Sequence, residues 1–95
     1  MASDGRPAAE KSFTIDNELG LHLRAAGKFV QTAGKFSAEI WVKRDDVEVN
    51  GKSIMGILSL AAARGATIHV RCIGGDAEKA LTALGALIVE KFHEE

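Results

Sequence analysis

The sequence predicts an α+β fold, a two-layer sandwich in which helices cover one face of a four-stranded sheet. First, alternating apolar and polar segments are interspersed with segments of helical apolar spacing, in the order β-α-β-β-α-β-α. Second, a short polar turn separates two successive strands, so the sheet is at least partly antiparallel. Third, each strand carries one apolar and one polar face, as a sheet with one solvated side requires.

The composition is that of one small globular domain. The chain has 95 residues, 46% hydrophobic and 26% charged, which excludes wholesale disorder. Its net charge of −1 offers no strong field to nucleic acid or an anionic membrane, so we expect neither partner. The single cysteine, Cys72, excludes an intramolecular disulfide and a multi-cysteine zinc site. Without a long apolar run or a secretory signal, the sequence predicts a soluble, cytoplasmic protein.

The first part of the chain predicts a tail, a strand and a helix. Residues 1–10 are small and polar without periodicity, so we expect a flexible tail there and a folded domain over residues 11–95. Residues 12–15 alternate polar and apolar, which predicts a half-buried strand, and turn-forming residues 16–20 end it. Residues 23–35 have apolar side chains on one helical face and predict an amphipathic helix.

The middle of the chain predicts a hairpin and a short helix. Residues 38–43 and 47–49 both alternate, and the polar residues 44–46 between them form the turn. Residues 54–63 are apolar nearly all round and too few to span a membrane. We interpret them as a short helix with Ser53 as its N-cap.

The last part of the chain predicts a fourth strand and a third helix. Residues 67–72 alternate apolar and polar side chains. Apolar residues then recur with helical spacing from residue 77 to about residue 91, and Asp76 is the expected cap of this helix.

His22 is the most informative position, because it stands at the start of the first predicted helix. The free N–H groups and partial positive charge there favour a neutral, nucleophilic ring and would bind an anion attached to it. Arg24 adds a fixed positive charge with a fork of donors suited to a phosphoryl group. The pattern is that of a phosphorylated histidine held electrostatically. The alternative is a surface cap beside a solvated arginine.

Ser53 is the second candidate. Its simpler role is to cap the short helix, and its functional role would be that of a phosphorylation site. A phosphate there would place about −2 charge beside Ile54 and Met55, which are more apolar than an ordinary surface. If those residues form a docking patch, phosphorylation weakens binding of an acidic partner.

The remaining candidates favour structural roles. Three histidines far apart, including His69 and His93, without a cysteine nearby do not predict a metal site. Trp41 falls on the polar side of its strand, so we expect partial exposure and simple packing. Cys72 falls on the apolar face and is expected to be a small core residue.

Two segments resemble a known family. Residues 20–26, with the sequence GLHLRAA, resemble the active-site segment of HPr, the histidine phosphocarrier of the bacterial sugar phosphotransferase system. Residues 52–60, KSIMGILSL, resemble the serine site of that family. The resemblance extends from residue 11 to about residue 91 and implies an open-faced β-α-β-β-α-β-α sandwich, with a four-stranded antiparallel sheet and three helices on one face.

The resemblance also implies roles for individual residues. His22 matches the residue phosphorylated on Nδ1, which receives the phosphoryl group from phosphorylated enzyme I and passes it to a histidine of a IIA domain. Arg24 matches the residue that assists transfer. Ser53 matches the site of the ATP-dependent HPr kinase/phosphorylase, and Ile54 and Met55 match part of the partner surface. The implied protein is a carrier and not an enzyme, binds no cofactor or resident metal, and docks briefly, which favours a monomer.

The sequence departs from the family pattern at two slots beside the histidine motif. Leu23 stands where relatives commonly have a small residue, which implies a larger docking surface or a narrower choice of partner. Ala25 replaces a common proline, and alanine is a good helix former. Two other functions stay open. One is a regulatory HPr-like module controlled by phosphorylation of Ser53, and the other is a small ligand-binding domain without phosphoryl transfer.

Overall fold

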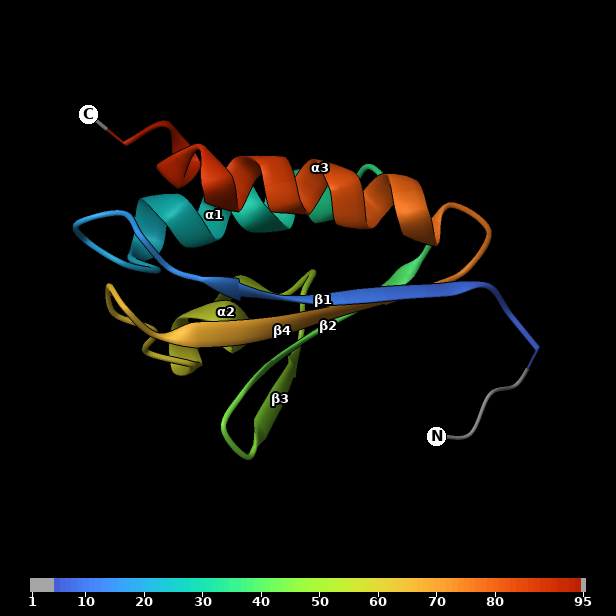
Figure 1. Ribbon diagram of the computed structural model, residues 1–95, viewed down its shortest axis with the longest axis horizontal. Helices are drawn as coiled ribbons and strands as arrows, with labels where there is room; N and C mark the ends of the chain where they lie inside the picture. The colour runs from blue at the N-terminus through green and yellow to red at the C-terminus, as the bar shows by residue number, and fades with distance from the viewer. Residues whose placement is uncertain (1–4, 95) are drawn as a thin grey trace.

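The architecture is a four-stranded antiparallel sheet packed against helices. The computed structural model describes residues 5–94. The strands lie in the order β1-β4-β2-β3, and every neighbouring pair is antiparallel. Figure 1 shows helices α1 and α3 over one face of the sheet. The elements in chain order are β1 (Ala8–Thr14), α1 (Leu23–Ala33), β2 (Glu39–Arg44), β3 (Val47–Asn50), α2 (Ile54–Ser59), β4 (Thr67–Ile73), α3 (Ala77–Val89) and a 3-10 turn, η1 (Lys91–His93).

The predicted fold class and element order are confirmed. Strand β4 shows the expected alternation most clearly, since Ile68, Val70 and Cys72 are buried while the residues between them are not. These side chains form the core together with the apolar faces of α1 and α3, where Phe29 and Leu84 are fully buried. Helix α2 packs against α1 and β3. The core therefore lies between the sheet and the helices, as a two-layer sandwich requires.

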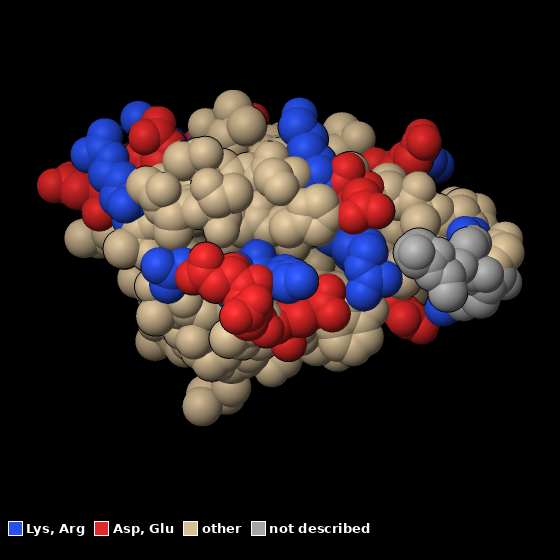
Figure 2. Space-filling model, turned by 60° about the horizontal axis from the view of Figure 1, so that its bottom comes forward, with Lys and Arg blue, Asp and Glu red and all other residues tan. Residues whose placement is uncertain are grey.

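The opposite face of the sheet carries charged side chains of both signs. Figure 2 shows acidic and basic side chains interspersed on this side of the molecule. Cross-strand pairs explain the arrangement, with Arg71 Nη2 3.3 Å from Glu48 Oε2 and His69 Nε2 2.6 Å from Glu10 Oε1. No helix within residues 5–94 has the length and apolar character needed to cross a membrane.

The first strand begins earlier than predicted. Residues 8–10 belong to β1, where Ala8 pairs with Ile73 and Glu10 with Arg71, so the expected tail over residues 1–10 is wrong for this part. Small alanines conceal the alternation there, and only pairing with β4 defines the strand. The first four residues of that predicted tail lie outside the described residues.

The second helix ends earlier than predicted, at Ser59 rather than at residue 63. Arg44, at the end of β2, donates from Nη1 to the carbonyl oxygens of Leu60 at 2.9 Å and Ala61 at 3.1 Å. Ala61 has a φ of 50°, which a continuing α-helix does not allow. A contact from a distant strand thus satisfies the carbonyls at the end of α2 and redirects the chain.

Asp76 does not cap α3 as predicted. Its side chain makes no capping bond, and its carboxylate instead accepts from the backbone N–H groups of Ser37 and Ala38, both at 2.9 Å. The hydrogen bond from Ser37, joined by that from Ala38, outweighs desolvation and lowers the pKa of the Asp76 carboxyl. The residue therefore ties the start of α3 to the segment before β2.

Cys72 is a core residue, as predicted. It is fully buried in β4. Burial, with a smaller contribution from the charge of Asp76, raises the pKa of its thiol to about 11, so it stays protonated and poorly reactive. Trp41 is half-buried, as expected, and its Nε1 donates to Glu39 Oε1 at 3.4 Å.

Gly20 is required where the chain turns toward α1. Its φ is +68°, and an added Cβ would lie 2.6 Å from the carbonyl oxygen of Ala62. We expect Gly20→Ala to lower the free energy of unfolding by about 2 kcal/mol or more, measured by denaturant titration. Gly27→Ala, within α1 and with nothing within 4 Å of its added Cβ, should instead raise it by about 0.5–1 kcal/mol. Equal effects of the two substitutions would contradict this account.

Candidate functional site

His22 is the N-cap residue of α1. Its backbone is extended (φ −74°, ψ 177°), and its Nδ1 accepts a hydrogen bond from the backbone N–H of Arg24 at 3.2 Å. Its carbonyl oxygen accepts from the N–H of Ala26 at 2.8 Å and so begins the helical ladder. The side chain is 28% exposed. The ring thus lies at the surface with Nδ1 directed to the first turn of the helix, where free N–H groups meet the positive end of the dipole.

The two ring nitrogens of His22 have different neighbours, a hydrogen-bond donor at Nδ1 and a carboxylate near Nε2. A backbone N–H points at Nδ1, whereas Nε2 lies 3.5 Å from Oε2 of Glu94. A nitrogen that accepts from an N–H must offer a lone pair, so the neutral ring carries its hydrogen on Nε2. This tautomer leaves Nδ1 as the nucleophilic atom, at the N-terminus of α1.

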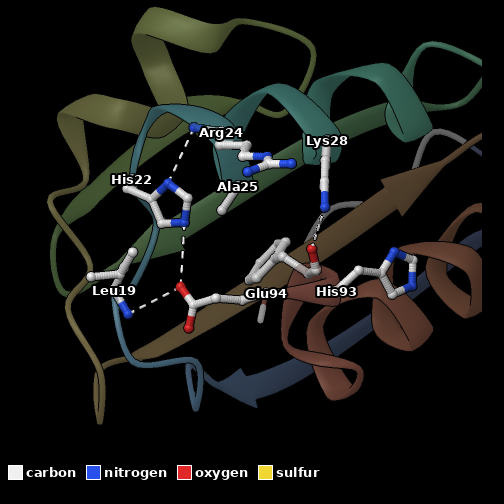
Figure 3. A pocket seen from close by; sticks show the side chains of 8 residues that line it. Leu19, His22, Arg24, Ala25, Lys28, His93 and Glu94 are labelled. Atoms are coloured by element: carbon white, nitrogen blue, oxygen red, sulfur yellow. Dashed lines mark hydrogen bonds and ion pairs between the residues drawn. The ribbon is translucent and has the colours of Figure 1, made fainter.

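Arg24 supplies a cation next to this ring. Figure 3 shows its side chain lying along α1 between His22 and Lys28. Its guanidinium has no hydrogen bond or ion pair with any group in residues 5–94. One turn further on, Lys28 donates from Nζ to the carbonyl oxygen of Phe92 at 2.7 Å. Two fixed positive charges therefore stand on the same side of α1 as the imidazole, and that of Arg24 is available to an anion.

A cavity of about 320 Å³ opens beside these groups. The loop before α1, the first turns of α1 and the C-terminal turn together form it (Figure 3). Its walls are mostly polar or charged, so it suits a small anion better than an apolar ligand. The lining residues are Leu19, His22, Arg24, Ala25, Lys28, Phe92, His93 and Glu94.

Glu94 is the residue of this site that the sequence did not indicate. Its carboxylate accepts from the backbone N–H groups of Glu18 at 2.7 Å and Leu19 at 3.3 Å, and from Nδ2 of Asn17 at 3.3 Å. Desolvation raises the pKa of this carboxyl, but these hydrogen bonds, that of Asn17 first, and the charge of His22 outweigh it and lower the pKa overall. Glu94 is therefore ionised at neutral pH.

Ser53 is the N-cap of α2, as predicted. Its Oγ accepts from the backbone N–H of Gly56 at 3.0 Å. The next two residues are exposed despite being apolar, Ile54 by 40% and Met55 by 77%. None of these three residues lines the cavity beside His22.

Further exposed apolar residues lie next to His22. Leu19 is 65% exposed and Leu23 is 66% exposed. Leu19 lines the cavity, whereas Leu23, the first residue of α1, does not. Single exposed apolar residues are ordinary, but several near one polar site are typical of a surface that contacts another protein.

The other histidines have local partners. His69 lies between Ser12, with Nδ1 2.9 Å from its Oγ, and Glu10 on β1. His93 lines the cavity and pairs with Glu90 at 2.7 Å. Across residues 5–94, no cluster of three or more His, Cys, Asp or Glu side chains has a geometry that could hold a metal ion.

Comparison with known proteins agrees with the geometry. The family model described as "PTS HPr component phosphorylation site" matches residues 9–90. The phosphocarrier protein HPr of Neisseria meningitidis is 49% identical over 85 residues, which cover 90% of this chain and 96% of that protein.

Solved structures give the same result. The crystal structure of HPr-C-His from Thermoanaerobacter tengcongensis has a TM-score of 0.88 and 49% identity, covering 92% of this chain and 98% of that one. A structure described as an HPr dimer from the same organism has a TM-score of 0.74 and 50% identity, covering 86% and 94%. The matches thus extend over both predicted motifs and nearly the whole domain. The chain belongs to the HPr family, the phosphocarrier proteins of the phosphotransferase system.

Proposed function

We propose that His22 receives a phosphoryl group on Nδ1 from phosphorylated enzyme I and passes it to a histidine of a IIA domain. The observation that carries this proposal is the position of Nδ1, at the N-terminus of α1 and 3.2 Å from the backbone N–H of Arg24. The ring is exposed enough for a partner to reach it, and its nucleophilic nitrogen already faces groups that bind anions.

The chemistry requires little beyond these groups. The lone pair of Nδ1 attacks the phosphorus, and the backbone N–H of Arg24 can then donate to a phosphoryl oxygen. The guanidinium of Arg24 stabilises the charge on the phosphoryl oxygens as the bond forms. Phosphoryl transfer depends mainly on positioning and charge stabilisation, so the carrier needs no resident metal or cofactor.

Partner proteins would dock on the exposed apolar residues. Leu23 directly follows His22 in the sequence. Ile54 and Met55 begin α2, which packs against α1. A surface with few anchors suits brief docking, because a carrier must leave its donor before it meets its acceptor. A monomer in the cytoplasm remains our prediction, although one related HPr has been described as a dimer.

The direct test is phosphorylation of the purified protein. Incubation with enzyme I and phosphoenolpyruvate should add one acid-labile phosphate, and subsequent addition of a IIA domain should remove it. Omission of phosphoenolpyruvate gives the background. A chain that takes up no phosphate while a known HPr is labelled by the same enzyme would contradict the proposal.

Ser53 is proposed as a regulatory site for an HPr kinase/phosphorylase. A phosphate adds about −1.5 to −2 charge beside Ile54 and Met55, and so makes docking of enzyme I less favourable. We expect an ATP-dependent, acid-stable label that Ser53→Ala removes, and Ser53→Asp should slow phosphorylation of His22 about tenfold, which corresponds to about 1.4 kcal/mol of docking energy. An unchanged rate in Ser53→Asp would argue for capping alone.

A further inference from the structure

The C-terminal turn places a carboxylate against the side of His22 that faces away from α1. Oε2 of Glu94 lies 3.5 Å from Nε2, and the Glu94 side chain is only 14% exposed (Figure 3). We propose that Glu94 is a positioning residue, which keeps the hydrogen of the imidazole on Nε2 and the lone pair on Nδ1. This inference rests on the proposed role of His22 as phosphoryl acceptor.

The carboxylate of Glu94 is fixed by the loop that leads into α1. The N–H of Glu18 donates to Oε1 at 2.7 Å, and the N–H of Leu19 and Nδ2 of Asn17 both donate to Oε2 at 3.3 Å. Asn17 is itself fully buried and also donates to the carbonyl oxygen of Gly20 at 2.7 Å. The donors are therefore held in place, and they orient Oε2 toward the ring while favouring the ionised carboxyl.

The chain is bent back to bring Glu94 to this position. Lys91, Phe92 and His93 have φ values of 58°, 56° and 57°, a left-handed run that residues other than glycine rarely adopt. The Phe92 ring is buried, with 2% exposure, and its carbonyl oxygen accepts from Nζ of Lys28. Contacts to α1 thus stabilise a turn whose positive φ angles are unfavourable for residues other than glycine.

The two polar neighbours of His22 favour the same tautomer. A neutral imidazole has one N–H and one lone pair. The N–H of Arg24 requires the lone pair on Nδ1, and the carboxylate of Glu94 requires the hydrogen on Nε2. A glutamine at position 94 has nearly the same shape but no negative charge, so it favours the hydrogen on Nε2 over the hydrogen on Nδ1 less strongly than the carboxylate does.

Glu94 also stabilises the charge that transfer creates. The Nδ1 lone pair forms the bond to phosphorus, while the bond between phosphorus and the donor breaks and its electron pair stays on the donor. The hydrogen on Nε2 remains, so the ring becomes positively charged opposite the Glu94 carboxylate. In onward transfer the P–Nδ1 bond breaks, its electron pair returns to Nδ1 and the ring is neutral again. The carboxylate therefore favours the first step, in which the ring becomes charged.

Glu94→Gln in the full chain tests this role. We expect phosphorylation by enzyme I and phosphoenolpyruvate to slow about tenfold, by analogy with the effect of losing the outer hydrogen-bond partner of a metal-binding histidine. Long-range ¹H–¹⁵N spectra of the imidazole should show a gain of the Nδ1–H tautomer. The matched control is Glu78→Gln, which makes the same charge change in the first turn of α3, away from the lining of this cavity, and should leave both readouts unchanged.

The pH dependence of hydrolysis of the phosphorylated protein gives a readout that a merely structural residue would not move. The charged and titratable groups around the ring are Arg24 and Lys28 on α1, Glu18 in the preceding loop, and His93 and Glu94 in the C-terminal turn. With Glu94 ionised, the cationic ring is favoured in the phosphorylated state, so hydrolysis of the phosphorylated protein should persist to higher pH in wild type than in Glu94→Gln.

The outcomes separate this inference from the proposed function. A wild-type protein that takes no label at His22 would refute the proposed function itself. Normal labelling of wild type, with the same rate, tautomer and pH profile in Glu94→Gln, would overturn the role of Glu94 alone. If the glutamine variant unfolds, Glu94→Ala decides, because it removes the carboxylate without placing another polar group beside Nε2. A wild-type rate and spectrum in that variant would equally overturn the inference.

Discussion

His22→Ala is expected to abolish uptake of phosphate from enzyme I and phosphoenolpyruvate. The substitution removes the only imidazole whose Nδ1 lies at the start of α1, and alanine has no nucleophile to replace it. The fold should persist, because the ring is partly exposed and its loss costs one capping hydrogen bond, about 1 kcal/mol. Circular dichroism and the absence of an acid-labile label on the variant test both statements.

The other two histidines supply controls for this result. His93→Ala is the stricter one, because His93 lines the same cavity, while His69→Ala changes a residue on the open face of the sheet. Both variants should be labelled. An acid-labile label that persists in His22→Ala would show that another residue accepts the phosphoryl group.

Arg24→Ala is expected to slow phosphorylation of His22 about 100-fold without abolishing it. Removing one preorganised donor to a developing anion typically reduces a rate about 10²–10³-fold. The backbone N–H of residue 24 remains in the variant, so the N-terminus of α1 still binds the phosphoryl oxygens. Rapid-quench measurement of the initial rate, with enzyme I in excess, gives the ratio to wild type.

Two variants show whether the effect belongs to the guanidinium. Arg24→Lys keeps the charge without the planar fork and should fall between alanine and wild type. Arg64→Ala removes an exposed arginine that lies 3.8 Å from Asp16, outside the lining of the cavity, and should not alter the rate. Equal rates for wild type and Arg24→Ala would remove this residue from the proposed mechanism.

Local patterns predicted the elements, and long-range contacts set their ends. The alternation in β4 and the helical spacing in α1 each lie within a single segment, so the sequence alone identified them. The start of β1 at Ala8 depends on pairing with Ile73, and the end of α2 at Ser59 depends on Arg44. Neither partner is visible from the residues at the boundary.

Capping side chains show the same distinction. Ser53 caps α2, as its place before an apolar run predicted, because its acceptor and the N–H of Gly56 are three residues apart. Asp76 stands before α3 in an equally suitable place, yet its carboxylate binds Ser37 and Ala38. Spacing along the chain cannot indicate that a distant loop offers better-placed donors.

The candidate site could be predicted only in part. His22 and Arg24 were identified because a histidine and an arginine at a helix start carry a local signal. Glu94 was missed, because it reaches His22 through a turn whose left-handed backbone is held by Phe92 and Lys28. No pattern in the last residues of the chain indicates that turn.

The position of the phosphorus atom tests the central claim most directly. The protein, with ¹⁵N-labelled histidine, is phosphorylated by enzyme I and phosphoenolpyruvate, and the nitrogen coupled to ³¹P is identified by NMR. The structure predicts coupling to Nδ1 of His22, which faces the backbone N–H of Arg24. Coupling to Nε2, or to a nitrogen of another histidine, would contradict it.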